Sequence, residues 1–269
     1  MAEARSLGNV EGLGEVFQIA APLDEQIKAF EDVGIAHPYL VTPAETAMIR
    51  IAGLSNDFTR TSVAPVKVKG AKTVLYKPSP LMNRAMAFLA VQQHRNGKYL
   101  EMPRELYDAV EAIAKSEEGI EPEDRTAIVV SQDGNFNLTP EMDETRFLLE
   151  GNAGKYIEKF SPKGIPFFGL DADSKNATVN YVWFGSPQGG SYLNCWGRGL
   201  GDGYGAFGVR RVSGEASARK IRYSLTEIGK ANSEVIPVVL QEAGLSGLAN
   251  TITRPLSKGL LEKLRMRSE

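Results

Sequence analysis

The sequence predicts an α+β fold in which two helices pack on small antiparallel sheets and a long, loop-rich C-terminal half follows. Apolar residues recur every three or four positions from Pro80 to Gln93 and from Pro103 to Lys115, which predicts two amphipathic helices. The glycine-rich C-terminal third needs these helices as support. We expect Phe207 to Val212 to be the strand that closes the sheet. Fewer than two helices between 80 and 115, or a parallel sheet, would contradict this prediction.

The composition is that of an ordinary globular protein. The chain has 269 residues, of which 42% are hydrophobic and 24% are charged, enough for one large domain or two small ones. The formal net charge of -2 gives no whole-chain attraction to nucleic acid or to an anionic membrane. The single cysteine excludes an internal disulfide and a multi-cysteine metal site, and the two histidines exclude a three-histidine centre.

The sequence favours synthesis in the cytoplasm without membrane insertion. No apolar run approaches the roughly 20 residues that span a bilayer. The first residues, MAEARSLGNVEGLGEVF, lack the basic and apolar regions of a signal peptide. Assembly into a virion or display at a surface stays open, because that route needs no cleavable signal.

Three patterns predict secondary structure before residue 77. The spacing of apolar residues predicts a helix from Leu23 to Phe30. A second helix should begin at Thr42, because its hydroxyl can cap the helix and Glu45, three residues on, can complete a capping box. From Phe58 to Tyr76 apolar residues alternate on either side of Lys-Gly-Ala-Lys, which predicts a β-hairpin.

The segment after the two main helices is predicted to hold strands and loops. Ala127 to Val130 has the pattern of a short strand, and Asp133-Gly134 that of a turn. Gly151 to Asp173 is rich in glycine, proline and aromatic residues, which predicts loops and short strands without a helix. The basic end, Lys258 to Arg267, has no aromatic platform, so a solvated helix end is favoured over a nucleic-acid site.

The most unusual segment runs from Asn180 to Val212. It contains both tryptophans, the only cysteine, and a glycine at every second position from Gly197 to Gly205. Such a segment has too few side chains to form its own core, so a scaffold must carry it. Its Tyr, Trp, Asn, Ser and Asp residues are types that ligand-contacting surfaces use. The alternative is a glycine-rich turn region between short strands.

The sequence contains weaker patterns for two other ligands, phosphate and calcium. The alternating glycines could cradle a phosphate, but no Lys-Ser/Thr follows them, and Ala206 to Arg210 favours a strand where a phosphate loop needs a helix N-terminus. Asp171, Asp173 and Asn176 could hold calcium in a loop. We weigh both below a binding surface, and we predict no metal ion and no cofactor.

Two short motifs give the segment from Ser79 to Val212 a resemblance to a known family. The first runs from an amphipathic helix to a second helix and consists of Phe88, Leu89, Gly97, Tyr99, Met102, Pro103, Glu105, Tyr107 and Ala109. The second consists of Gly189, Gly190, Ser191 and the closing strand Gly208 to Val212. In this order the motifs resemble the C-type lectin fold, in the variant shared with formylglycine-generating enzyme. The resemblance covers about half of the chain and implies that fold.

Within that family, the sequence is most similar to the variable proteins of diversity-generating retroelements, which include phage tropism determinants. The resemblance implies that the segment before the closing strand is rewritten at template adenines and forms a ligand-binding surface. It implies a lectin domain at 78–214 with a variable region at about 180–212. It also implies an N-terminal extension at 1–77, packed on that domain or preceding it, and a C-terminal extension at 215–269.

The resemblance implies a set of ligand-contacting residues within about 181–205. A strand-and-loop backbone should direct them to one exposed face, for a protein or cell-surface ligand. Gly189-Gly190 and Gly208-Val209 would hold the fold beneath them. Rewritten codons do not yield Trp, so Trp183 and Trp196 are expected in the scaffold, although a fixed Trp196 could touch a ligand. The predicted contact residues are Tyr181, Phe184, Ser186, Tyr192, Asn194, Trp196, Arg198, Asp202 and Tyr204.

Two further functions remain open. A formylglycine-generating-type oxidoreductase needs a pair of copper-binding cysteines, and the related sulfoxide-forming enzymes use histidine-ligated iron. The chain offers only Cys195, His37 and His94 for these roles, and both histidines have the setting of surface or helix-capping residues. We therefore predict a binding protein without a catalytic residue. The third option is a structural component of a virion or surface. The sequence predicts neither the ligand nor the oligomeric state.

Overall fold

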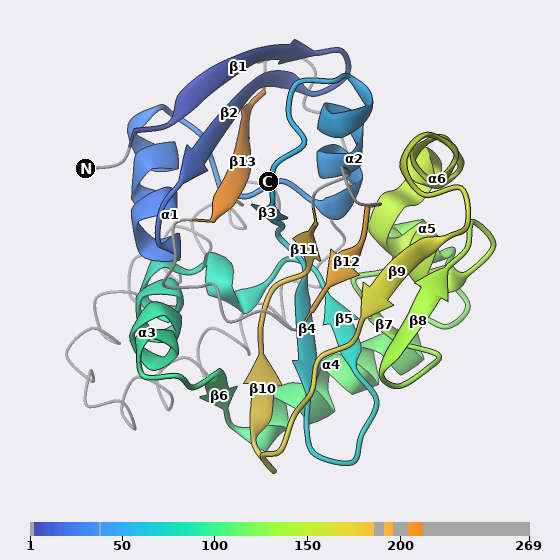
Figure 1. Cartoon of the computed structure of the whole chain (residues 1–269). Coiled ribbons are helices and arrows are strands. Elements are labelled where there is room, and N and C mark those ends of the chain that lie inside the picture. Colours follow the sequence, from blue (N-terminus) through green and yellow to red (C-terminus); the bar gives the residue numbers. More distant parts are fainter. Residues whose placement is uncertain (1–2, 38, 186–190, 196–203, 212–269) are drawn as a thin grey trace, which may run out of the picture. The chain divides into compact units, whose positions relative to one another are not determined.

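The structure is a computed structural model that describes residues 3–37, 39–185, 191–195 and 204–211. The chain divides into two compact units, Met1–Ala216 and Ser217–Glu269, and all described residues lie in the first. This unit contains two β-sheets with helices around them (Figure 1). The α+β class predicted from the sequence is confirmed.

The larger sheet joins the first and last strands of the described chain. Its eight strands are, in spatial order, β1 (Arg5–Val10), β2 (Gly14–Ala20), β13 (Gly205–Arg210), β3 (Thr59–Arg60), β11 (Trp183–Phe184), β12 (Leu193–Asn194), β9 (Ile165–Phe168) and β8 (Asn135–Leu138). Neighbours are antiparallel except β13 with β3 and β12 with β9, which are parallel. The sheet is therefore mixed.

The smaller sheet is antiparallel throughout. Its five strands are, in spatial order, β6 (Leu100–Met102), β10 (Ala177–Val179), β4 (Ala64–Lys67), β5 (Val74–Tyr76) and β7 (Ala127–Val129). β4 and β5 form the hairpin that the sequence predicts between Phe58 and Tyr76, and β7 is the strand predicted from Ala127. Both predictions are confirmed.

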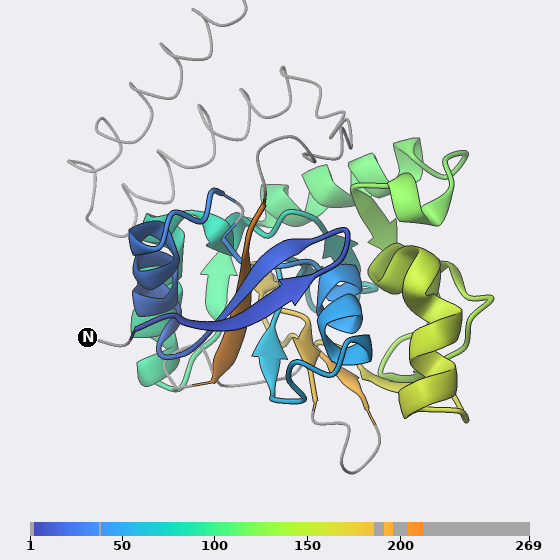
Figure 2. The same ribbon diagram turned by 90° about the horizontal axis from the view of Figure 1, so that it is seen from above.

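Helices lie on several sides of the two sheets. In the described chain they are α1 (Leu23–Asp32), α2 (Pro43–Ile51), α3 (Arg84–Arg95), α4 (Arg104–Ser116), α5 (Asp143–Leu149) and α6 (Ala153–Phe160), with 3-10 turns η1 (Pro80–Met82), η2 (Pro122–Asp124) and η3 (Glu150–Asn152). α1 packs against α3, α2 packs against α5 and α6, and α4 packs on β5, β7 and β10 (Figures 1 and 2). Among the described residues, no helix is long and apolar enough to cross a membrane.

Local sequence signals explain where the predicted helices begin. The capping box of α2 is present, since Glu45 N donates to Thr42 Oγ1 (3.1 Å) and Thr42 N donates to Glu45 Oε2 (2.8 Å). The helix predicted from Pro80 begins instead at Arg84, because Asn83 caps it by accepting from two main-chain N–H groups. Pro80 starts the separate turn η1. α4 lies within one residue of its predicted bounds.

Two predictions about the fold are wrong. Residues 151–173 contain the helix α6, which buries Ala153, Tyr156 and Ile157 on one face. The closing strand β13 does not belong to the antiparallel sheet that carries α4, but lies in the mixed sheet between β2 and β3. Gly208 in β13 packs against α1, where a β-carbon would lie 2.9 Å from Phe30 Cδ1. This contact supports the predicted structural role of Gly208.

The segments 1–77 and 78–211 share both sheets. β2 and β3, from the first segment, flank β13, while β4 and β5 lie between β10 and β7. The core mixes the two segments in the same way, since Val63 and Leu75 belong to one hydrophobic cluster with Phe147, Tyr156 and Phe184. The first 77 residues are thus part of the scaffold that holds β11, β12 and β13.

Candidate functional site

The structure separates the predicted contact residues by exposure. Tyr204 is 42% exposed, and Tyr192 and Asn194 are partly buried. Tyr181 and Phe184 are both 0% exposed. The remaining predicted residues lie outside the described part of the chain, together with Gly189 and Gly190: Ser186, Trp196, Arg198 and Asp202.

The prediction that Tyr181 and Phe184 project from an exposed face is wrong. Residues 180–184 run from β10 in the small sheet to β11 in the large one, and every residue of this stretch is buried. β11 has β3 on one side and β12 on the other, so it is an interior strand. Phe184 packs edge-on against Tyr156, with ring centroids 5.5 Å apart. Both residues belong to the scaffold rather than the surface.

Five aromatic side chains form a continuous cluster at the ends of the strands, and we call it the aromatic cluster. Its ring centroids are 5.5 Å apart for Phe168 and Tyr192, 5.9 Å for Tyr192 and Phe58, 6.3 Å for Phe58 and Tyr204, and 5.2 Å for Tyr204 and Trp183. Phe58 is 38% exposed, whereas Trp183 is buried, as expected of a scaffold tryptophan. The cluster combines predicted residues with Phe58 and Phe168, which sequence reasoning missed.

The ring of Tyr192 packs directly against Gly185. Gly185 N donates to Tyr192 O (2.8 Å), and a β-carbon at position 185 would lie 2.3 Å from Tyr192 Cε1. Burial raises the pKa of Tyr192, and the neighbouring Tyr204 raises it further, so the phenol stays protonated near neutral pH. Tyr192 therefore offers a neutral, partly exposed ring held against the backbone.

Arg50 of α2 holds the chain just before residues 186–190, which lie outside the described part. Its side chain is buried, Nη1 donates to Gly185 O (2.5 Å), and Nη2 donates to Phe184 O (3.3 Å) and Asp57 O (2.5 Å). The guanidinium also lies 4.9 Å from the centroid of the Phe184 ring. Burial lowers the pKa of Arg50 from its ordinary value, which shows the cost of keeping this cation out of water.

Helix α6 and its C-cap residue Ser161 hold the chain just after residues 186–190. Tyr156 Oη and Ser191 Oγ are 2.6 Å apart in a buried hydrogen bond, and Arg50 Nη1 also donates to Tyr156 Oη (3.1 Å). Ser161 Oγ donates to Ser191 O (3.1 Å). Gly185 and Ser191, which flank residues 186–190, are therefore fixed by one connected network.

Two amides hold the chain on either side of residues 196–203. Asn180 Nδ2 donates to Cys195 O (2.9 Å), and Gln26 Nε2 donates to Tyr204 O (2.5 Å). Both amide side chains are buried. With Arg50, Tyr156 and Ser161, they make a set that we call the anchor residues: Gln26, Arg50, Tyr156, Ser161 and Asn180. The positions that flank residues 186–190 and 196–203 are thus each held from the core.

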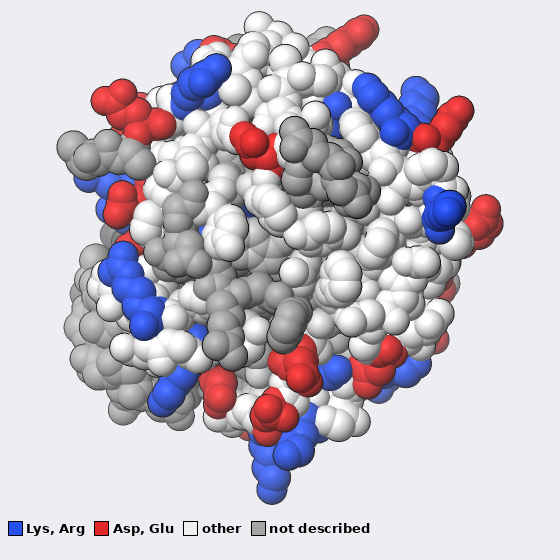
Figure 3. Space-filling view, viewed as in Figure 1, with Lys and Arg blue, Asp and Glu red and all other residues white. Residues whose placement is uncertain are grey.

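The face that carries these strands has most of its charge at the periphery. In Figure 3, the Lys, Arg, Asp and Glu side chains that are coloured lie mainly toward the rim, and the described residues visible nearer the centre are mostly uncharged. The carboxylate next to the aromatic cluster is Asp57, which accepts hydrogen bonds from Gln18 Nε2 (2.6 Å) and Ser55 Oγ (3.2 Å). The aromatic cluster itself presents uncharged side chains.

Cys195, His37 and His94 are the side chains that the copper or iron chemistry considered above would use. Cys195 is fully buried, and burial raises the pKa of its thiol well above the ordinary value. Burial lowers the pKa of His37, and His94 lies buried in the last turn of α3. Within the described ranges, no group of three or more His, Cys, Asp or Glu side chains could hold a metal ion.

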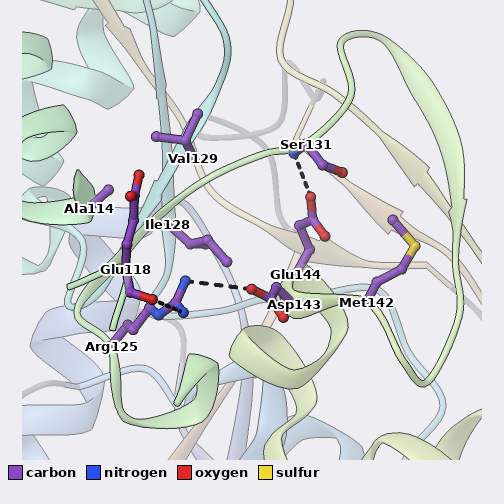
Figure 4. Close-up of a pocket in the computed structure, with 9 residues that line it drawn as sticks. All are labelled: Ala114, Glu118, Arg125, Ile128, Val129, Ser131, Met142, Asp143 and Glu144. Atoms are coloured by element: carbon purple, nitrogen blue, oxygen red, sulfur yellow. Dashed lines mark hydrogen bonds and ion pairs between the residues drawn. The ribbon is translucent and has the colours of Figure 1, made fainter. Parts of the chain in front are cut away.

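A cavity of about 390 Å³ lies away from the aromatic cluster, between α4, β7 and α5 (Figure 4). Three of its charged side chains, Arg125, Asp143 and Glu144, already have partners. Arg125 Nη2 donates to Glu118 O (3.0 Å), Arg125 pairs with Asp143 at 3.6 Å, and Glu144 Oε1 accepts from Ser131 N (2.5 Å). These contacts brace the wall of the cavity and leave the aromatic cluster as the better candidate for binding.

No protein-family model matches the sequence, and no curated protein matches it. Among solved structures, the chain is similar to a protein from Nanoarchaeota in which the C-type lectin fold accommodates massive sequence variation. The two sequences are 17% identical, the match covers 72% of this chain and 96% of that chain, and the TM-score is 0.47. A likeness of this degree assigns no function to the chain.

Proposed function

We propose that the protein is a non-enzymatic binding protein, in which the exposed residues of about 181–205 present a diversifiable surface to a protein or cell-surface ligand. The sequence motifs resemble those of the C-type lectin fold, which would supply the scaffold. One observation carries the proposal: the anchor residues reach this segment mainly through its main-chain oxygens, at Gly185, Ser191, Cys195 and Tyr204.

Main-chain anchoring suits a surface whose side chains change. Every residue type supplies the same carbonyl oxygen, so these hydrogen bonds survive a substitution in the segment. The bond to a segment side chain, from Tyr156 to Ser191, involves a residue outside the predicted contact set. A rigid scaffold that holds loops by their ends is how many binding surfaces combine a stable core with variable contacts. Partly exposed tyrosines add contact area at low entropic cost.

The proposal includes the absence of catalysis. Copper or iron chemistry of the related enzymes needs cysteine pairs or several histidines, whereas this chain has one cysteine and two histidines. Metal analysis of the purified protein separates the two functions. We expect substoichiometric copper and iron, and one equivalent of either metal would favour the oxidoreductase over the binding protein.

Population sequencing tests the proposal directly. The gene should be amplified from many cells or particles of one source population. We expect amino-acid differences to gather at codons for residues of about 181–205, while the codons for the buried Tyr181 and Phe184 and for the anchor residues stay constant. A near-copy of the DNA that encodes Tyr181 to Val212, beside a reverse-transcriptase gene and differing only at adenines, would be the template. Differences spread evenly along the gene, with no such copy, would overturn the proposal.

A further inference from the structure

Phe58 lies outside the predicted variable segment but within the aromatic cluster. It immediately precedes β3, contacts the rings of both Tyr192 and Tyr204, and is 38% exposed. We propose that Phe58 is a constant contact residue of the binding surface, and that the ligand is a protein that presents an uncharged, apolar or aromatic side chain to it. This inference rests on the proposed function.

The backbone of Phe58 is fixed on both sides. Before it, Asp57 O accepts from Arg50 Nη2 (2.5 Å). After it, β3 pairs with β13, where a β-carbon on Gly205 would lie 2.7 Å from Phe58 O. The backbone at Phe58 is therefore placed by main-chain contacts, which do not depend on the side chains of the variable segment. A contact that is already in place loses little conformational entropy on binding.

The chemistry of Phe58 selects the kind of group that it contacts. Its side chain has no hydrogen-bond donor or acceptor, and its neighbours in the cluster are aromatic rings. The neighbouring carboxylate of Asp57 already accepts from Gln18 and Ser55. An apolar centre with charge toward the rim is the usual organisation of a protein–protein contact, and the charged side chains drawn in Figure 3 lie mainly toward the rim. A carboxylate buried here would lose its water next to the carboxylate of Asp57, so an uncharged group is favoured over an anion.

A constant apolar contact would complement a variable surface. Substitutions in the segment would then change which protein is recognised, while Phe58 would contribute affinity to many of the complexes. Central aromatic residues are the type that carries most of the binding energy in protein interfaces. Phe88 on α3 provides a matched control, because it is also a phenylalanine, is 46% exposed, and stands apart from the cluster.

The test uses a library of the full-length protein. Codons for Ser186, Asn194, Arg198 and Asp202 are randomised, and binders are selected separately against lysozyme and streptavidin. Phe58→Ser and Phe88→Ser are then introduced into the binders, and their Kd values are measured. We expect Phe58→Ser to raise Kd about tenfold or more in most binders to both targets, and Phe88→Ser to leave Kd unchanged.

Each outcome bears on the inference. Unchanged Kd values after Phe58→Ser, in binders to both targets, would overturn the role of Phe58 and leave the proposed function standing. A library that yields no binder to either target would count against the proposed function, and with it against the inference. Melting curves show whether Phe58→Ser is folded. If it is not, Phe58→Leu, which keeps the apolar character, should weaken binding less than tenfold but measurably, and no loss at all would overturn the inference.

Discussion

The anchor residues and the aromatic cluster meet the same chain segment in opposite ways. The anchor residues are buried, polar, and bonded mainly to main-chain oxygens, as Arg50 is to Gly185 and Asn180 is to Cys195. The aromatic cluster is apolar and partly exposed, and its contacts are made by side chains, as between Tyr192 and Phe58. The anchor residues hold the main chain of the segment, and under the proposed function the aromatic cluster would supply the side chains that contact the ligand.

This difference predicts that the anchor residues contribute mainly to the free energy of unfolding and the aromatic cluster mainly to binding. Removing a buried hydrogen-bonding group leaves its partners without water or a protein donor, so it costs far more than the net value of one bond. Truncating an exposed side chain changes stability by about 0.5 kcal/mol. If the division holds, variants of the anchor residues should unfold more easily, while variants of the surface should mainly change binding.

Replacing Arg50 should have the largest effect. Arg50→Met keeps most of the apolar side chain but leaves the oxygens of Gly185, Phe184 and Asp57 without their donor. We expect a loss of about 3 kcal/mol of unfolding free energy, measured by urea denaturation. Arg104→Met is the control, because Arg104 is exposed on α4 and pairs with Asp108 at 3.4 Å. The control should lose under about 0.5 kcal/mol. Equal losses in the two variants would break the comparison.

A methyl group at Gly205 should have the next largest effect. The new β-carbon would meet Phe58 O at 2.7 Å, and a main-chain atom cannot move aside as a side chain can. We expect Gly205→Ala to destabilise the protein by about 2 kcal/mol in thermal melting. Gly154→Ala is the opposite case, because its β-carbon would meet open space in helix α6, and it should stabilise by about 0.5–1 kcal/mol. A stable Gly205→Ala would show that the backbone at Phe58 is free to shift.

Local signals predicted the helices whose ends are marked in the sequence. Thr42 and Glu45 form the predicted capping box because both partners lie within one turn. Helix α6 was missed because the glycine, proline and aromatic residues of 151–173 suggested loops and short strands. The spacing of Ala153, Tyr156 and Ile157 was its signal, and burial of that face outweighs the low helix propensity of glycine.

Sequence reasoning found the residues of the aromatic cluster that lie in the unusual segment 180–212, but not those that other segments contribute. Tyr192 and Tyr204 lie in the segment identified by composition, and both are in the cluster. Tyr181 and Phe184 have the same composition, but neighbours distant in sequence cover both faces of their strand. Phe58 stands alone among polar residues, so no local pattern marks it. Its role depends on contacts with residues more than a hundred positions away.

A smaller effect should follow from cutting the link between α6 and Ser191. Tyr156→Phe removes the hydroxyl that bonds Ser191 Oγ and accepts from Arg50, while it keeps the buried ring. We expect a loss of about 1.5 kcal/mol. Ser191→Ala should lose about 1 kcal/mol, and the double variant should lose less than the sum because the two share one hydrogen bond. Additive losses would mean that this bond does not hold the segment.

Truncating the surface side chains should have the smallest effect on stability. Asn194→Ala and Tyr204→Ala each remove a side chain that is at least partly exposed, so we expect losses of about 0.5 kcal/mol. Tyr192→Ala should cost about 1 kcal/mol, because its ring also packs on Gly185 and Phe168. Asp202→Ala, outside the described residues, completes the series with the same expectation as Asn194.

The quadruple alanine variant then tests whether the surface is independent of the core. Tyr192 and Tyr204 both touch Phe58, so their effects should be coupled. Asn194 and Tyr204 share Trp183 as a neighbour, because Asn194 pairs with Trp183 across β12 and β11 and the Tyr204 ring packs on it, so a coupling is expected there too. Thermal melting of the four single variants and the combined variant measures the loss at each site and the coupling between sites. A loss near or above roughly 2 kcal/mol at any single site would make that side chain structural. In that case the segment could not vary freely at that position, and the separation between anchors and surface would fail there first.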